Sequence, residues 1–152
     1  MQPEARHAGN VVLIRGAALW LLMALALAWC MVGLNLGVGP LKAVFSGKFT
    51  RLLQAHLDFL LMSALIFGFY AARVSLPWHV RWAIVVGAFT NSSMFLLLSI
   101  FPELDSPAPP ADLFGQIFQA CRLASIIITS YGFGAGAVIV LTSTFRVRPE
   151  SS

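Results

Sequence analysis

The run QAHLDFLLMSALIFGFY, from Gln54 to Tyr70, decides the fold of this chain. It belongs to a longer apolar stretch, residues 49–72, whose length suits a helix that crosses about 30 Å of hydrocarbon. Two ionisable residues, His56 and Asp58, nevertheless lie near the start of the stretch. Side chains of this kind are costly in hydrocarbon and are usually kept for a specific contact or for function. The run therefore indicates a membrane helix with a purpose beyond spanning.

The chain as a whole is too apolar for a soluble domain. It has 152 residues, of which 59% are hydrophobic and only 11% charged. Such a composition indicates lipid rather than water as the outer solvent. We therefore predict an all-α fold, an integral membrane bundle of four transmembrane helices that forms a single domain over residues 1–152. The predicted helices cover residues 17–37, 49–72, 82–101 and 117–145.

The distribution of charge predicts the orientation in the membrane. The net charge is +4, and with four crossings the two termini share one side with the Arg73–Arg81 loop. That side is rich in arginine, and positively charged loops stay inside, so we expect both termini to be cytoplasmic, in a bacterial inner membrane. No basic stripe with interleaved aromatic residues occurs in the sequence, so no nucleic-acid partner is expected. The basic residues instead indicate contact with the heads of the lipid bilayer.

Two segments allow more than one interpretation. Residues 17–37 resemble a signal peptide, but no small-x-small cleavage site follows them, so we expect them to remain as a helix. The Pro-rich loop Phe101–Gly115 is either a lid on the outer face or a stiff connector. Gly132 and Gly136 permit a close helix contact, either inside the bundle or between copies of the chain.

Polar side chains of three predicted helices fall at a similar depth in the outer half of the membrane. His56 and Asp58 lie about 10–14 Å along the second helix, at 1.5 Å per residue. Asn91 lies about 15 Å before the end of the third helix by the same rise, and Arg122 lies in the second turn of the fourth. These residues form a candidate constellation, although equal depth does not establish contact.

Direction separates the two ionisable residues of the second helix. Side chains two positions apart differ by about 200° around a helix, so His56 and Asp58 do not point at one site. Because an isolated buried carboxylate is expensive, Asp58 is expected to pair with Arg122 or Arg51, or to accept hydrogen bonds from Asn91. The structural hypothesis is a polar pair of Asp58 and Arg122, unless Arg122 instead extends to the outer interface.

His56 is the stronger functional candidate. A neutral imidazole can bind a metal, serve as an axial ligand of haem or carry protons. No second histidine lies in the predicted membrane part, so a site built from several histidines is not expected. One histidine can supply the iron ligand of a haem, with aromatic side chains as walls, although these residues are equally suited to ordinary packing. The candidate wall residues are Phe59, Phe67, Phe89 and Phe95.

Two motifs resemble a known family. AHLD at Ala55–Asp58 and GAFTNSSMFLLL at Gly87–Leu98 are similar to the styrene-oxide isomerase and hydroxylaminobenzene mutase group of small four-helix membrane proteins. The resemblance spans roughly the last three helices. It implies a homotrimer that binds haem b through one axial histidine, here His56. It also implies that ferric iron acts as a Lewis acid on an epoxide oxygen, that a hydride shift yields an aldehyde, and that Asn91 contacts the substrate.

The sequence departs from the isomerase pattern at three positions. Met62 replaces a polar amide, Phe95 replaces a tyrosine, and Gly87 replaces an acid. These changes remove groups that would orient an epoxide, so the substrate is specified only as a small lipophilic molecule.

Three functions remain open from the sequence. The first is a haem-dependent isomerase or mutase. The second is a non-catalytic accessory subunit or haem-binding protein, in which the polar residues only tie helices together. The third, a transporter or proton path, lacks the broken helices and inverted repeats that would support it.

Overall fold

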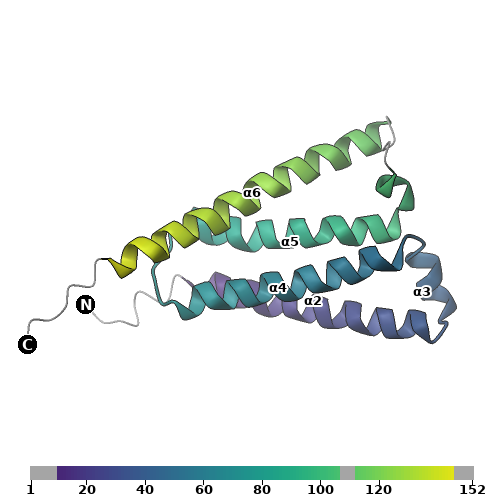
Figure 1. Cartoon of the computed structure of the whole chain (residues 1–152), viewed down its shortest axis with the longest axis horizontal. Helices are drawn as coiled ribbons and strands as arrows, with labels where there is room; N and C mark the ends of the chain where they lie inside the picture. Colours follow the sequence, from purple (N-terminus) through teal and green to yellow (C-terminus); the bar gives the residue numbers. More distant parts are fainter. Residues whose placement is uncertain (1–9, 107–111, 146–152) are drawn as a thin grey trace, which may run out of the picture.

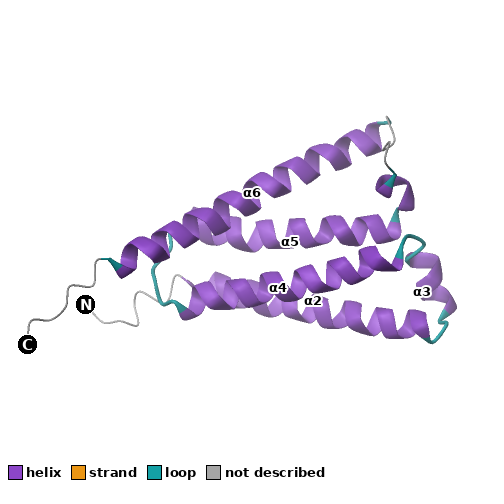
Figure 2. Cartoon of the chain, in the orientation of Figure 1, coloured by secondary structure: helices purple, strands orange, loops and turns teal. Residues whose placement is uncertain are grey.

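The computed structural model describes residues 10–106 and 112–145. This part of the chain consists of helices joined by short turns and contains no strand (Figure 2). Four of the helices are long and apolar enough to span a membrane, so the predicted fold class is confirmed. The long helices are α2 (Val11–Asn35), α4 (Phe49–Ala71), α5 (Trp78–Ile100) and α6 (Leu113–Thr144), and the short ones are α3 (Gly39–Val44) and the 3-10 helix η2 (Pro102–Asp105).

The long helices are arranged in sequence order. α2 packs against α4, α4 against α5, and α5 against α6 (Figure 1). The short helices α3 and η2 lie at one end of the bundle, which we call the α3–η2 end, and Arg73 lies at the opposite end. α6 packs mainly along α5 and stands away from α4 at the α3–η2 end (Figure 1). This divergence matters for the site described below.

The buried side chains form two apolar clusters. One cluster joins α2, α4 and α5 and includes Leu13, Ile66 and Ile84. The other, nearer the α3–η2 end, includes Leu52 and Phe59. Because lipid tails are as apolar as leucine, contact between these helices depends on close packing and on interhelical hydrogen bonds.

Glycines set the distance between α5 and α6. A Cβ atom added to Gly132 would lie 2.6 Å from the backbone nitrogen of Ile84, and one added to Gly136 would lie 2.9 Å from the Phe69 ring. Both glycines are buried. Gly132 and Gly136 therefore serve a contact inside the bundle, which answers one question left open by the sequence.

Three long helices begin earlier than predicted, and one short helix was not predicted. α5 begins at Trp78 rather than at residue 82, and α6 begins at Leu113 rather than at residue 117. α2 begins at Val11 rather than at residue 17, and just before it the buried Asn10 donates through Nδ2 to the Val74 carbonyl at 3.0 Å. α3, which was not predicted, begins with Gly39 and Pro40, residues that usually interrupt helices. Proline is tolerated in the first turn of a helix, where its missing N–H leaves no hydrogen bond unmade.

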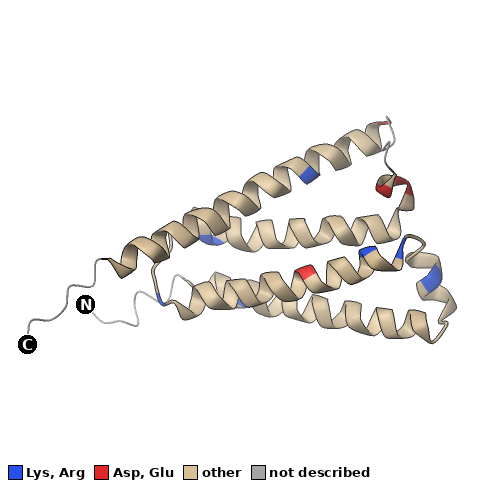
Figure 3. Cartoon of the chain, viewed as in Figure 1, with Lys and Arg blue, Asp and Glu red and all other residues tan. Residues whose placement is uncertain are grey.

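Most charged residues of the described chain lie near the ends of the helices (Figure 3). Most of the length of each long helix carries neither acidic nor basic residues (Figure 3). Arg6, Arg146 and Arg148, on which the predicted cytoplasmic termini partly depend, lie outside the described residues, as do residues 107–111 of the loop interpreted as a lid or a connector.

Candidate functional site

α4 places His56 and Asp58 on opposite flanks, as the helical spacing predicted. The imidazole of His56 turns toward α2, where its Nδ1 atom lies 2.9 Å from the carbonyl oxygen of Ala24. The carboxylate of Asp58 turns toward α5 and contacts Asn91 and Ser92. The predicted constellation is therefore divided into two separate sites.

One oxygen of the Asp58 carboxylate, Oδ2, is within hydrogen-bond distance of two donors from α5. Asn91 donates through Nδ2 at 2.9 Å, and the Ser92 hydroxyl lies 2.8 Å away, both at Oδ2. The Ser92 hydroxyl is fully buried and is also within 3.0 Å of the Ala88 carbonyl. Hydrogen bonds to an ionised group are strong, so they offset the cost of removing a carboxylate from water. Asp58 thereby ties α4 to α5.

Arg122 is not the partner of Asp58. The two side chains form no ion pair, and Arg122 makes no hydrogen bond or ion pair with any other described residue. Arg51, the other basic candidate, donates to Asp105 and to Gln54 Oε1. The predicted pair of Asp58 and Arg122 is therefore not formed, because α6 stands away from α4 at this level (Figure 1).

Asp105 is the centre of an ion-pair cluster at the α3–η2 end. Arg51 of α4 pairs with Oδ1, and Lys48 Nζ lies 2.8 Å from Oδ2. The hydrogen bond from Arg51, followed by that from Lys48, holds the pKa of this carboxyl below its usual value, against a smaller opposite effect of burial. The sequence analysis missed this cluster. The predicted topology offered one signal, since it placed Lys48, Arg51 and Asp105 on the same side of the membrane.

The contact of His56 determines which ring nitrogen is free. A carbonyl oxygen only accepts hydrogen bonds, so Nδ1 carries the proton that it donates to Ala24. In the neutral ring, Nε2 then holds a lone pair. Metal-binding histidines typically donate their second ring N–H to a carbonyl or carboxylate in this way, which fixes the tautomer and the orientation of the ring.

The four candidate phenylalanines are all engaged in apolar contacts of the bundle. Phe59 is fully buried, with its ring centroid 6.3 Å from that of Trp20 and 6.3 Å from that of Phe89. Phe89 stacks on Trp20 at 4.6 Å. Phe67 packs against the Leu13 cluster, and Phe95 packs against the Phe59 cluster while lining the cavity described below. Both Phe59, three positions after His56, and Phe67, eleven positions after it, lie near the His56 face of α4.

The third-helix motif is used for helix contacts. Thr90 Oγ1 accepts from the Ser125 hydroxyl at 2.9 Å, which ties α5 to α6. A Cβ atom on Gly87 would lie 2.8 Å from Thr129 Cα. The acid of the isomerase pattern therefore has no room at position 87 in this arrangement of α5 and α6. Met62, at another departure from that pattern, packs against the apolar core.

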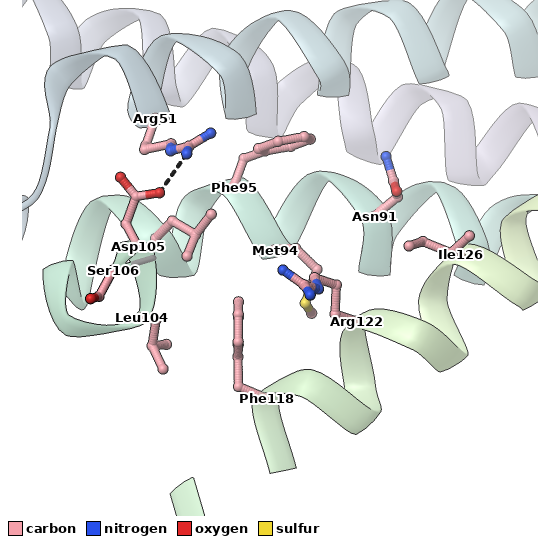
Figure 4. A pocket seen from close by; sticks show the side chains of 11 residues that line it. Arg51, Asn91, Met94, Phe95, Leu104, Asp105, Ser106, Phe118, Arg122 and Ile126 are labelled. Atoms are coloured by element: carbon pink, nitrogen blue, oxygen red, sulfur yellow. Dashed lines mark hydrogen bonds and ion pairs between the residues drawn. The ribbon is translucent and has the colours of Figure 1, made fainter. Parts of the chain in front are cut away.

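A cavity of about 470 Å³ lies between α4, α5, η2 and α6. Its polar wall includes Arg51, Asn91 and Arg122, whereas Phe95 and Phe118 are part of its apolar wall. In Figure 4, Arg51 faces Asp105, and Arg122 extends from α6 toward Met94 with no interaction drawn to it. His56 is not among the lining residues. The further lining residues are Leu98, Leu104, Ser106 and Ile126.

Two further observations concern possible metal ligands and similar proteins. Among residues 10–106 and 112–145, no group of three or more His, Cys, Asp or Glu side chains is placed to hold a metal ion. Comparison of the chain with protein-family models, curated proteins and solved structures finds no match.

Proposed function

We propose that this protein binds haem b through Nε2 of His56 and that it is an isomerase or mutase of a small lipophilic molecule within the membrane. The observation that carries the haem proposal is the hydrogen bond from His56 Nδ1 to the Ala24 carbonyl, at 2.9 Å. It orients the ring and leaves Nε2 as the atom able to bind iron.

The residues present fit the ligand role better than the wall role. His56 is partly buried in the α2–α4 contact, with Leu60 one turn further along α4. Phe67 lies further along nearly the same face, whereas Phe59 and Phe89 are committed to the aromatic cluster with Trp20. The flank of one chain therefore supplies the ligand and only part of an apolar wall. Assembly into a homo-oligomer, a trimer by resemblance, belongs to the same proposal because a neighbouring copy would supply further wall.

The isomerase activity rests on the resemblance of AHLD and GAFTNSSMFLLL to the styrene-oxide isomerase group. When bound, ferric haem would supply a Lewis acid that polarises a substrate oxygen. The role of Asn91 is less well supported, because its amide nitrogen is engaged by Asp58 on the other flank of α4. Within one chain, Asn91 is a positioning residue for α4 and α5 rather than a substrate contact beside His56.

A specific observation also favours the second candidate, a non-catalytic accessory subunit. The intramembrane polar residues tie neighbouring helices together: His56 joins α4 to α2, Asp58 joins α4 to α5, and Thr90 joins α5 to α6. Interhelical hydrogen bonds of this kind stabilise membrane bundles without any ligand. The two candidates differ in whether Nε2 of His56 has a ligand.

An absorption spectrum separates the two candidates. The full chain is expressed with haem supplied, purified in a mild detergent and examined for a Soret band. We expect the band in the wild type, its loss in His56→Ala, and its partial return when imidazole is added to that variant, because free imidazole replaces the missing ligand.

The matched control is His79→Ala. His79 is exposed near the start of α5 and lies 2.8 Å from the Tyr131 hydroxyl, so its loss should leave the band unchanged. A colourless wild-type protein, or a band that persists in His56→Ala, would reject the haem proposal and leave the accessory subunit as the better explanation.

A further inference from the structure

The cavity between α4, α5, η2 and α6 is distinct from the His56 flank and has a chemistry of its own. Its volume of about 470 Å³ is in the range of pockets that hold small molecules. It also combines charged and polar groups with an aromatic and aliphatic wall of similar extent. Such a combination favours a ligand with one polar end and one apolar body.

The charges on the cavity wall are unequal. Arg51 and Asp105 both line the cavity, and they neutralise one another in an ion pair. Arg122 also lines it, but this guanidinium has no hydrogen-bond or ion-pair partner among the described residues. The wall is therefore left with one uncompensated positive charge.

The position of Arg122 makes this charge costly without a partner. Arg122 lies about 13 Å along α6 from Leu113, at 1.5 Å per residue, and α6 is apolar enough to span a membrane. An arginine at such a depth usually faces a cavity and pairs with an opposite charge or with water. The guanidinium presents several donors in a plane, an arrangement that matches the two oxygens of a carboxylate or phosphate.

Asn91 adds an acceptor to the same wall. Its amide nitrogen must face Asp58, because a carboxylate only accepts hydrogen bonds, and the amide oxygen remains for the cavity. Beside these polar groups, Met94, Phe95 and Phe118 provide an apolar surface. Arg122 would hold an oxyanion, and the apolar side chains would contact an aliphatic or aromatic body, while the Asn91 oxygen could accept only from a hydroxyl or N–H of the ligand.

We propose that this cavity binds the anionic oxygen group of an amphipathic molecule, with Arg122 as the residue that recognises it. The molecule is either a free lipophilic carboxylate or the headgroup of an anionic lipid, since both present the same oxygens. The proposal does not depend on haem, because His56 does not line the cavity.

The first arm of the test uses decanoate as the probe and decanol as its uncharged counterpart. Binding to the purified full chain in a neutral detergent is measured by calorimetry. We expect decanoate to bind more tightly than decanol, and Arg122→Gln to weaken decanoate about tenfold or more, since a hydrogen bond to a charged group is lost. Arg122→Lys should fall between the two because it keeps the charge but loses the planar donor pair.

The second arm tests the lipid source. The chain is placed in nanodiscs of mixed phosphatidylglycerol and phosphatidylcholine, and retained lipid is identified by native mass spectrometry. Selective retention of phosphatidylglycerol that Arg122→Gln removes would identify a lipid headgroup. A response confined to decanoate would identify a free carboxylate.

Two controls make the outcome decisive. Lys42→Gln removes an exposed positive charge from α3, outside the cavity, and should change neither arm. His56→Ala should also bind both probes as the wild type does, so a failure of the haem proposal does not affect this test. If Arg122→Gln changes neither decanoate affinity nor lipid retention, or if Lys42→Gln changes them equally, the cavity does not bind an oxyanion through Arg122.

Discussion

The two flanks of α4 differ in the hydrogen bonds that their polar residues make. On the α5 flank, Asp58 has two hydrogen-bond partners of the same chain, Asn91 and Ser92, both at Oδ2. On the α2 flank, the structure gives His56 one bond, to Ala24, which leaves the second ring nitrogen free. The two residues lie within one turn of the same helix, so depth does not explain the difference.

The comparison shows how an intramembrane polar residue can be assigned a role. A charged side chain that binds two donors of a neighbouring helix contributes to stability through those bonds. A side chain that is oriented by one bond and retains a free atom is suited to binding. By this criterion, Asp58 is structural, and His56 and Arg122 are the candidates for ligand contact.

The largest effect is expected from breaking the occupied flank. Asp58→Ala should lower the free energy of unfolding by about 3 kcal/mol, because two donors of α5 lose their acceptor. Thermal unfolding in detergent, followed by circular dichroism, measures the change. The double variant Asp58→Ala/Asn91→Leu should be less destabilised than the sum of its single changes. A melting temperature equal to that of the wild type would show that these bonds do not stabilise the α4–α5 contact.

A smaller effect is expected when His56, the polar residue on the α2 flank, is replaced by alanine. His56→Ala should lower the free energy of unfolding by about 1 kcal/mol, since a single neutral hydrogen bond is lost. The Ala24 carbonyl keeps its place in the hydrogen-bond ladder of α2, so no buried acceptor is orphaned. The same unfolding experiment, made without haem, measures it. A loss as large as that of Asp58→Ala would remove the distinction between the flanks.

The smallest effect concerns a second carboxylate, that of Asp105, which lies at the end of the bundle. The ion pairs of Asp105 lower its pKa below the usual 3.8, so they stabilise the fold at pH values above 3.8. This contribution should disappear as the pH falls below 3.8 and through the lowered pKa. The difference in melting temperature between the wild type and Asp105→Asn, measured across this range, should therefore shrink toward low pH. A constant difference would exclude the ionised pair as its cause.

Much of the fold follows from the sequence because hydrocarbon imposes a length and an apolar composition on each crossing. Residues 49–72 were predicted as a helix, and α4 covers Phe49–Ala71. The opposite directions of His56 and Asp58 were also predictable, since they depend only on the 100° step of one helix. α3 was missed because the effect of a proline depends on its position within a helix.

The partners of the polar residues were less predictable. Rise along a helix gives depth, but contact also needs the rotation and tilt of the neighbouring helix. Because α6 tilts away from α4, Arg122 forms no ion pair with Asp58. The rotation of α5 instead turns Asn91 toward Asp58. Nothing in the sequence indicated that Phe59 and Phe89 both pack on Trp20. Trp20 lies in α2, outside the three helices that the resemblance covers.

The contact at Gly87 has a consequence for any protein that shares this motif. With a Cβ atom only 2.8 Å from Thr129 Cα, even alanine would force the two backbones apart, and a carboxylate would require still more space. A protein that carries an acid at this position must therefore hold its third and fourth spans further from one another. The identity of one side chain thus reports the width of an interhelical gap, and with it the room available to a substrate between those spans.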